Sequence, residues 1–435
     1  MDYELCFSEG NFQVRDKILK LLKKNHVFLT GGAGVGKSYL SREIIKEYKK
    51  NSKEVVILGS TGISAVGIGG QTVHSFFGFG ICSNIDELVV QDRKNRQKIK
   101  EIKKILQSCD LIVIDEISMI SANLLDMIRY RVENSSFEGS FLFVGDFFQL
   151  PPIVQRDNSL LGGGVYAFES VAWEVFDPVK VELFEMKRTK DKRFFQMLGR
   201  IRVGELDSEV LEYLINLCKN SFILESEPTF LYGRNFEANE TNIKKLSKHP
   251  QKEVSVKAKL DLHKKRVSKN RVQSWINSLP VEEELRLKVG VPILFTSNRW
   301  GKFANGERGV LKEIGDDYLI VEKNGREIRV QKQDFDLIEY KADDNEGIKE
   351  VSLATVSQYP LKLAYAITIH KSQGMSIENL VCNIDRIFTK SQFYVAIGRA
   401  IEPKKLYIQH NKPNIQNHFK NIIKSDERVK TFYGL

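Results

Sequence analysis

The segment "GGAGVGKS", Gly31 to Ser38, combines residue types and a spacing that can bind a nucleoside triphosphate. It matches the pattern G-x-x-x-x-G-K-[ST] between a strand-like run and a helix-like run, which is the context that the pattern requires. Glycines allow backbone N–H groups to close around phosphate oxygens. Lys37 can reach the β- and γ-phosphates, and Ser38 can hold Mg²⁺. The segment therefore predicts a phosphate-binding loop (P-loop).

Two carboxylates follow a second apolar run, "LIVIDEIS" (111–118), at Asp115 and Glu116. Side chains at the carboxyl end of a strand lie where open α/β sheets bind their ligands. We predict that Asp115 holds Mg²⁺ through its water shell and that Glu116 orients and polarises the attacking water.

A third apolar run, in "VGDFFQLPP" (144–152), ends at Asp146 and is followed by Gln149. The neutral amide of Gln149 can contact both a water and a phosphate oxygen. The alternative is that Asp146 only caps the following turn and that Gln149 is exposed.

The runs that precede these polar residues are continuously apolar, which is typical of strands buried on both faces of a parallel sheet. They cover 26–30, 55–59, 111–115 and 141–146. Helical spacing over 15–24, and of Leu40, Ile44, Ile45 and Tyr48, predicts helices that cover such a sheet. We expect an α/β domain over 1–180, with a small insertion around 72–108.

A second set of strand-like runs predicts a second α/β domain, over 181–294 and 356–435. The runs are 179–184, 229–233, 364–369, 380–384 and 405–409. Between its two parts, Asn324-Gly325 separates β-rich segments and predicts a type I′ hairpin. We therefore expect a small antiparallel β module over 295–355, with the acidic segment 341–347 as a loop.

The composition is that of a folded soluble chain, with 42% hydrophobic and 28% charged residues. A formal charge of +10 favours a polyanionic partner, although only weakly. No apolar run is long enough to span a membrane, and the acidic start "MDYELCFSEG" predicts no secretory signal. The five cysteines are scattered without zinc-ligand spacing, so we interpret them as structural or incidental in a reducing compartment.

Seven segments together resemble the PIF-one family of DNA helicases, in the RecD-like branch of superfamily-one helicases. They are "GGAGVGKS", "STGISAVGIGGQTVHSFFG" (60–78), "VIDEISMI" (113–120), "GDFFQLPP" (145–152), "KRTKDKRFFQMLGRIRVG" (187–204), "AYAITIHKSQGMS" (364–376) and "YVAIGRA" (394–400). They span nearly the whole chain, and the combination of "GDFFQLPP" with "TIHKSQG" is specific.

The resemblance implies an α/β fold with two RecA-like parallel-sheet domains, ATP and Mg²⁺ in the cleft between them, and an SH3-like module inserted in the second domain. It also implies that the nucleotide contacts the loop through Gly32, Ala33, Gly34, Val35, Gly36, Lys37 and Ser38. Catalysis would rest on Lys37, Glu116, Gln149, Arg188 and Arg399.

Within this set, Gln149 corresponds to the γ-phosphate sensor, and Arg188 and Arg399 would reach the γ-phosphate across the cleft. Gln13 corresponds to an adenine-reading glutamine, and Gly374 belongs to a loop that closes on the phosphate. The chain departs from the family pattern at Thr189, where the family has Gln, and at Gly398, where it has Ser.

A translocase grips phosphates with hydroxyls, amides and a few aromatic rings. One domain would supply Thr61, Thr72, His74, Ser75, Phe76 and Phe77, and the other Thr368, His370, Lys371 and Ser372. Asn298 would position the backbone at the DNA interface where the second domain meets the module, and Arg299 or Trp300 could contact DNA there.

Other roles remain open for several of these positions. Phe76 and Phe77 could instead belong to the core, and His74 and His370 could be ordinary hydrogen-bonded histidines. The basic segment 91–105, expected as a helix, is either a solvated face or a phosphate-contacting surface.

The resemblance thus implies a monomeric, intracellular ATP-dependent DNA helicase that moves 5′ to 3′ on single-stranded DNA and opens tailed or forked duplexes. Forks, RNA–DNA hybrids and G-quadruplex DNA remain alternative substrates. One competing hypothesis is a RecD-type subunit that acts only within a nuclease complex. Another is an ATP-gated DNA-binding protein that remodels partners without moving on DNA. We expect no membrane association and a cytoplasmic location, bacterial or viral.

Overall fold

The computed structural model describes residues 11–80, 82–152, 164–220, 227–263, 267–299, 301–343 and 347–435. Cys6, Trp300 and part of the predicted acidic loop, residues 344–346, lie outside these ranges.

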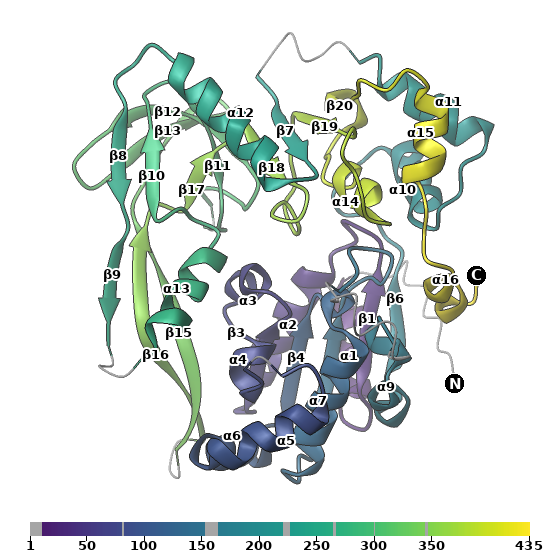
Figure 1. Cartoon of the computed structure of the whole chain (residues 1–435), viewed down its shortest axis with the longest axis vertical. Helices are drawn as coiled ribbons and strands as arrows, with labels where there is room; N and C mark the ends of the chain where they lie inside the picture. The colour runs from purple at the N-terminus through teal and green to yellow at the C-terminus, as the bar shows by residue number, and fades with distance from the viewer. Residues whose placement is uncertain are drawn as a thin grey trace.

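The N-terminal half forms a six-stranded, all-parallel sheet in the order β3-β2-β4-β5-β1-β6 (Figure 1). Its strands are β1 (Val27–Gly31), β2 (Val55–Gly59), β3 (Gln71–Thr72), β4 (Leu111–Asp115), β5 (Ser140–Val144) and β6 (Val179–Leu183). Every residue of β1, β2 and β4 is buried, as the continuous apolar runs predicted. The sheet therefore has helices on both faces.

Alternate side chains of each strand enter different cores. Val27 and Leu29 pack with α1 (Asn11–Leu21) and α2 (Lys37–Lys50), whereas Phe28 enters an aromatic core on the opposite face. That second face is covered by α5 (Ile85–Lys94), α6 (Arg96–Ser108), α7 (Ala122–Glu133) and α9 (Val171–Phe176). The expectation of one helix over 91–105 is wrong, because α5 ends at Lys94 and α6 begins at Arg96 on the other side of Asn95.

Short elements complete this half at the carboxyl ends of the strands. They are α3 (Gly62–Ile68), α4 (Val73–Phe77), and the 3₁₀ turns η1 (Ile117–Met119) and η2 (Ala167–Glu169). The C-terminal helix α16 (Glu427–Tyr433) also returns to this sheet: Val429 and Tyr433 join its aromatic core, and Tyr433 Oη lies 2.7 Å from Thr30 Oγ1.

A second parallel sheet has the order β18-β7-β19-β20. Its strands are β7 (Thr229–Tyr232), β18 (Ala366–Thr368), β19 (Leu380–Asn383) and β20 (Leu406–Gln409). Its core is shared with α10 (Lys192–Arg202), α11 (Ser208–Leu217), α14 (Gln392–Ile397) and α15 (Ile415–Ile422). The turn η4 (Pro403–Lys405) precedes β20. Two parallel sheets therefore confirm the predicted α/β class.

Antiparallel strands occupy the chain between β7 and β18, after α12 (Asn235–Lys248). One sheet has the order β14-β13-β12-β11-β17 and contains β11 (Pro292–Phe295), β12 (Arg308–Ile314), β13 (Leu319–Lys323), β14 (Arg326–Val330) and β17 (Leu361–Leu363). Asn324 and Gly325 connect β13 to β14 with φ values of 51° and 73°. Two successive positive φ values are those of the predicted type I′ turn.

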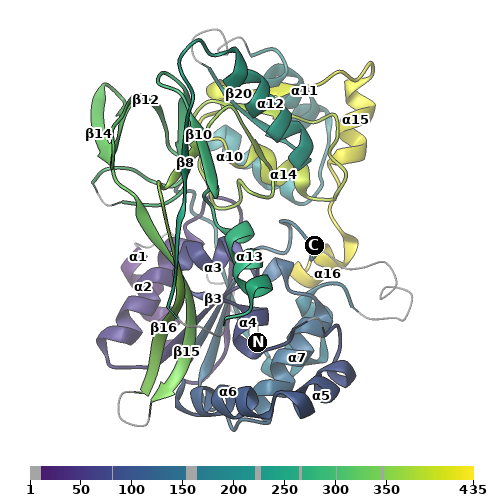
Figure 2. The same ribbon diagram turned by 60° about the vertical axis from the view of Figure 1, so that its left-hand side comes forward.

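A long hairpin extends from this antiparallel region along the first sheet (Figures 1 and 2). It consists of β15 (Gln333–Asp343) and β16 (Gly347–Gln358), and β9 (Lys259–Leu262) pairs with its edge. The predicted loop 341–347 is therefore partly strand, because Lys341–Asp343 pair with Gly347–Lys349. Tyr340 of β15 anchors the hairpin by accepting a hydrogen bond from the Ile57 N–H of β2, at 3.2 Å. The region also contains β8 (Val254–Lys257), β10 (Glu284–Leu287) and α13 (Lys269–Ser278).

Candidate nucleotide site and nucleic-acid interface

The P-loop turns from β1 into α2. Gly34 and Gly36 have φ values of 84° and 94°, which side-chain-bearing residues rarely adopt. Lys37 Nζ donates to the carbonyl oxygens of Gly31 at 2.7 Å and Gly32 at 2.9 Å. Burial lowers the pKa of Lys37, and the nearby Asp146 and Glu116 oppose this shift. The ammonium group is thus held over the loop.

Ser38 and Val35, two other residues of the P-loop, differ in which of their atoms can contact a ligand. Ser38 is exposed in the first turn of α2, so its hydroxyl is accessible. Val35 is 4% exposed and packs in the core beneath the loop, so only its backbone faces a ligand.

The paired acids stand where β4 ends. Asp115 is buried, and burial raises its pKa to about 7, with the charge of Glu116 adding to the shift. Glu116 has a φ of 55°, an uncommon conformation for a non-glycine residue, and burial also raises its pKa. Gln373 Nε2, from the loop after β18, donates to Glu116 Oε2 at 3.3 Å. The second half of the molecule therefore contacts the acid directly.

Asp146 forms a structural ion pair. It is fully buried, and Arg202 donates to it from Nη2 at 2.9 Å and from Nε at 3.2 Å. Its Oδ1 also accepts from the Phe148 N–H at 3.1 Å, so Asp146 caps the following turn, as the alternative predicted, and pairs with Arg202 as well. That alternative is wrong for Gln149, which is 5% exposed and lies beside the aspartate.

The two predicted arginines approach the P-loop. Arg188 donates its backbone N–H to Gly34 O at 3.1 Å, and its guanidinium donates to Ser376 Oγ and Gly398 O. Arg399 is 2% exposed and donates from Nε to Val395 O at 2.9 Å. Burial lowers the pKa of both side chains: that of Arg188 falls to about 9, with Arg399 contributing, whereas Glu116 opposes the shift of Arg399.

The two departures from the family pattern have structural accounts. Thr189 is buried, and its Oγ1 accepts from the Asp191 N–H at 3.1 Å, so it stabilises the turn before α10. A Cβ at Gly398 would lie 3.2 Å from the Cβ of Ala33. The glycine therefore allows the end of α14 to approach the P-loop closely.

Gln13 and Gly374 stay predictions. Gln13 is exposed on α1. Gly374 is exposed with a φ of 77°, and a Cβ there would meet no atom within 4 Å.

In the first half, several residues that were predicted to contact DNA also stabilise the local structure. Thr61 and Thr72 cap α3 and α4 by accepting from the N–H groups of Ser64 and Ser75. His74 is exposed. Phe76 is a correction: it is 3% exposed and packs in the aromatic core together with Phe77. A ring in that position cannot stack on a base, so core packing is the better interpretation of both residues.

In the second half, some of the residues that were predicted to contact DNA are exposed and others are buried. Lys371 is exposed and His370 is partly buried, and burial lowers the pKa of His370. Thr368 is 4% exposed, and its Oγ1 accepts from the Lys371 N–H at 3.4 Å. Ser372 is a correction, because it is fully buried and donates its hydroxyl to Ile369 O at 2.8 Å.

Asn298 is exposed, and its Oδ1 accepts from the Asn305 N–H at 2.8 Å. Its side chain holds a turn, as the predicted positioning role requires.

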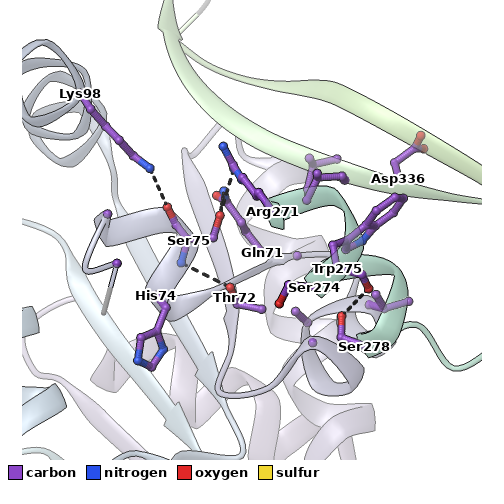
Figure 3. A pocket seen from close by; sticks show the side chains of 18 of the residues that line it. Gln71, Thr72, His74, Ser75, Lys98, Arg271, Ser274, Trp275, Ser278 and Asp336 are labelled. Atoms are coloured by element: carbon purple, nitrogen blue, oxygen red, sulfur yellow. Dashed lines mark hydrogen bonds between the residues drawn. The ribbon is translucent and has the colours of Figure 1, made fainter. Parts of the chain in front are cut away.

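A cavity of about 560 Å³ joins the first half to the antiparallel region (Figure 3). Thr72, His74 and Ser75 line one side, and Trp275 of α13 lines the other. Lys98 of α6 and Arg271 of α13 both extend toward Ser75: Lys98 Nζ lies 3.4 Å from Ser75 O, and Arg271 Nη2 lies 3.0 Å from Ser75 Oγ.

Sequence reasoning did not single out Lys98, Arg271 or Trp275. Lys98 lies within the basic segment 91–105, where Lys100, Lys103 and Lys104 are exposed, as a solvated face requires. A phosphate-contacting surface stays a prediction. Arg271 and Trp275 had no local signal, because only the packing of α13 against α3 brings them to this cavity.

Two further residues were missed inside recognised motifs. Gln373 contacts Glu116, and Tyr394 Oη accepts a hydrogen bond from the Ala33 N–H of the P-loop at 2.7 Å. Both contacts join segments that are distant in sequence, so motif spacing could not reveal them.

Among the described residues, no helix is long and apolar enough to cross a membrane. In the same part of the chain, no cluster of three or more His, Cys, Asp or Glu side chains forms a metal site. A P-loop with one aspartate and one serine does not require such a cluster, since phosphates and water supply the other oxygens around Mg²⁺.

Comparison with known proteins agrees with this geometry. A family model described as "PIF1-like helicase" matches residues 9–211, and a second, described as "Helicase", matches residues 338–431. The ATP-dependent DNA helicase Pif1 of Campylobacter jejuni is 43% identical over 431 residues, which cover 96% of each chain.

Solved structures of Pif1 from Bacteroides have the same fold. The complex with ADP-AlF4 has a TM-score of 0.83 at 25% identity and covers 99% of this chain and 97% of that one. The complex with ADP-AlF3 and single-stranded DNA has a TM-score of 0.64 at 25% identity and covers 98% and 97%. These likenesses support the predicted pair of RecA-like domains. The chain therefore belongs to the PIF1-like helicase family.

Proposed function

We propose that this protein is an ATP-dependent DNA helicase whose nucleotide site lies between the two parallel-sheet halves. The observation that carries the proposal is the meeting of residues from both halves around one P-loop: Arg188 and Tyr394 contact it, and Gln373 contacts Glu116. ATP hydrolysis that depends on both halves can drive their relative movement.

The residues around the loop fit ATP with Mg²⁺. Lys37 would contact the β- and γ-phosphates, and Ser38 and Asp115 supply the hard oxygen ligands that Mg²⁺ prefers. Burial raises the pKa values of both acids, and a bound dication would stabilise their carboxylate forms. When bound, the metal would neutralise developing phosphate charge. Glu116 would hold the attacking water, with Gln149 beside it, and Arg188 and Arg399 would stabilise the transferred phosphoryl group.

We propose a domain division that follows the strand pairing. The first RecA-like domain would comprise residues 1–183, with α4 to α6 as its small insertion. It would end later than the expected residue 180 because β6, which was expected in the second domain, pairs with β1 up to Leu183. The second would contain β7 and β18 to β20. The antiparallel insert would extend from Val254 to Leu363, wider than the range 295–355 expected from sequence, because β8 pairs antiparallel with β10 and β9 pairs antiparallel with β16.

We place single-stranded DNA along the cavity beside α3 and α4 and across the loop after β18. Thr72, His74 and Ser75 would contact it from one domain, and His370 and Lys371 from the other. Lys98 and Arg271 would add phosphate contacts, and Trp275 could stack on a base. These groups recognise the backbone rather than base edges, so binding should depend weakly on sequence and strongly on salt.

Unwinding of tailed duplexes tests the proposal directly. The purified chain with ATP and Mg²⁺ should separate a duplex with a 5′ single-stranded tail and leave one with a 3′ tail intact, because we propose 5′-to-3′ movement. The Lys37→Ala and Glu116→Gln variants should bind DNA but separate neither duplex. If either variant unwinds like wild type, the assigned nucleotide site is wrong.

The same assay separates the competing functions. Unwinding by the chain alone would exclude a subunit that needs a nuclease complex. ATP hydrolysis that is unaffected by single-stranded DNA, without unwinding, would instead favour an ATP-gated remodeller. Forked, G-quadruplex and RNA–DNA substrates of equal tail length would then rank the preferred targets, and light scattering would test the predicted monomer.

A further inference from the structure

One peptide unit of the P-loop is held from both sides. The carbonyl oxygen of Gly32 accepts from Lys37 Nζ at 2.9 Å. The N–H of the same peptide, which belongs to Ala33, donates to Tyr394 Oη at 2.7 Å. Because the C=O and N–H of a trans peptide point in opposite directions, this peptide lies between the lysine and the tyrosine.

The tyrosine belongs to the element that carries the second-domain arginine. Tyr394 lies on α14, and the carbonyl of its neighbour Val395 accepts from Arg399 Nε at 2.9 Å. Gly398, at the end of the same helix, accepts from Arg188 and allows close approach to Ala33. Movement of α14 would therefore move the contacts of both arginines and of the loop peptide together.

The environment of Tyr394 favours a fixed, neutral hydroxyl. The side chain is 3% exposed, and burial raises its pKa, so it stays protonated. Within the described residues, the hydroxyl forms no hydrogen bond other than the one from Ala33. The hydroxyl of Tyr394 therefore bonds to the P-loop of the other domain and, among the described residues, not to its own domain.

We propose that Tyr394 is a positioning residue that ties the P-loop to the arginine-bearing helix α14 and so sets the distance between Lys37 and Arg399 when the cleft closes. This inference rests on the proposed ATPase function. Tyr394 acts through the loop peptide and need not touch the reacting atoms. Nucleotide binding by the first domain alone should not need it, whereas phosphoryl transfer, which uses both domains, should.

The Tyr394→Phe variant removes the hydroxyl and keeps the ring. We expect kcat of the DNA-stimulated ATPase to fall about tenfold, while the dissociation constant of a fluorescent ADP analogue changes less than about twofold. An unchanged kcat would overturn the inference. An equal change in kcat and ADP affinity would also overturn it, since that result indicates a general disturbance of the loop.

Tyr340→Phe is a matched control. Tyr340 is also a buried tyrosine, and its hydroxyl also accepts a backbone N–H of the first domain, that of Ile57, at 3.2 Å. The two variants should lower the thermal midpoint to a similar extent, but Tyr340→Phe should leave kcat unchanged. If it lowers kcat equally, the Tyr394 effect is one of stability and the inference fails. If wild-type protein hydrolyses no ATP, the proposed function fails together with this inference.

Discussion

Arg202 and Arg399, two arginines with little solvent exposure, have opposite electrostatic surroundings: the Arg202 side chain is 13% exposed, and Arg399 is 2% exposed. Arg202 donates to Asp146 and Glu182, and its guanidinium also lies over the Phe148 ring. Arg399 is more buried than Arg202, yet within the described part of the chain it forms no ion pair with a carboxylate and donates only to a carbonyl.

The pKa directions follow this contrast. Burial alone would lower the pKa of both side chains, but the charge and hydrogen bonds of Asp146 outweigh it for Arg202, whose pKa is raised. For Arg399 burial prevails and the pKa is lowered. Arg188 resembles Arg399, since its guanidinium donates to a hydroxyl and a carbonyl. A buried arginine that is paired with a carboxylate of the protein, such as Arg202, has a structural role. A buried arginine without such a partner among the described residues, such as Arg399, is suited to bind an external anion.

Replacement of Arg399 by alanine should have the largest effect on activity. We expect about a 10³-fold loss of DNA-stimulated ATPase, the scale of a missing arginine at a transferred phosphoryl group. Nucleotide and DNA binding should persist. The free energy of unfolding should fall less than in Arg202→Ala, because the variant leaves a cavity but, in the described part of the chain, no buried carboxylate that has lost its ion-pair partner. Steady-state ATPase and urea unfolding would measure the two quantities, and an Arg399→Ala protein that is destabilised as much as Arg202→Ala would contradict the contrast.

Replacement of Arg202 by alanine should have its main effect on stability. It leaves Asp146 buried without its partner, which should lower the free energy of unfolding by about 3–5 kcal/mol in urea titrations. Arg200→Ala is a matched control on the same helix, because Arg200 pairs with Glu205 and two other exposed carboxylates. That exposed pairing should be worth about 1 kcal/mol or less. If both variants lose the same free energy of unfolding, the pairing of Arg202 with buried Asp146 is no more stabilising than the exposed pairing of Arg200.

The same contrast predicts smaller effects in the DNA cavity. Arg271 is paired with Glu339 at 3.2 Å, whereas Lys98 contacts only a carbonyl among the described residues. Lys98→Ala should therefore weaken single-stranded DNA binding more than Arg271→Ala. It should also reduce the slope of log affinity against log salt by about 0.7. Fluorescence anisotropy over a series of salt concentrations would measure both, and a larger change of slope for Arg271→Ala would reverse the assignment.

Much of the fold followed from sequence because its signals are local. Continuous apolar runs located the parallel strands, and Asn324-Gly325 located the hairpin. The failures arose where tertiary packing decides. Phe76 and Ser372 lie in motifs that also contain exposed residues, such as His74 and Lys371, yet the core covers both. The pairing of Arg202 with Asp146 and the contact of Tyr394 with Ala33 join residues 56 and 361 positions apart, which no spacing rule connects.

The most direct test of the central claim is a comparison of ADP with ADP-aluminium fluoride, which mimics the transferred phosphoryl group. If Arg188 and Arg399 bind the transferred phosphoryl group, wild-type protein should bind the fluoride complex at least about tenfold more tightly than ADP. Arg399→Ala should bind both with nearly equal affinity and keep its affinity for ADP. An Arg399→Ala protein that retains the full preference for the fluoride complex would contradict the account.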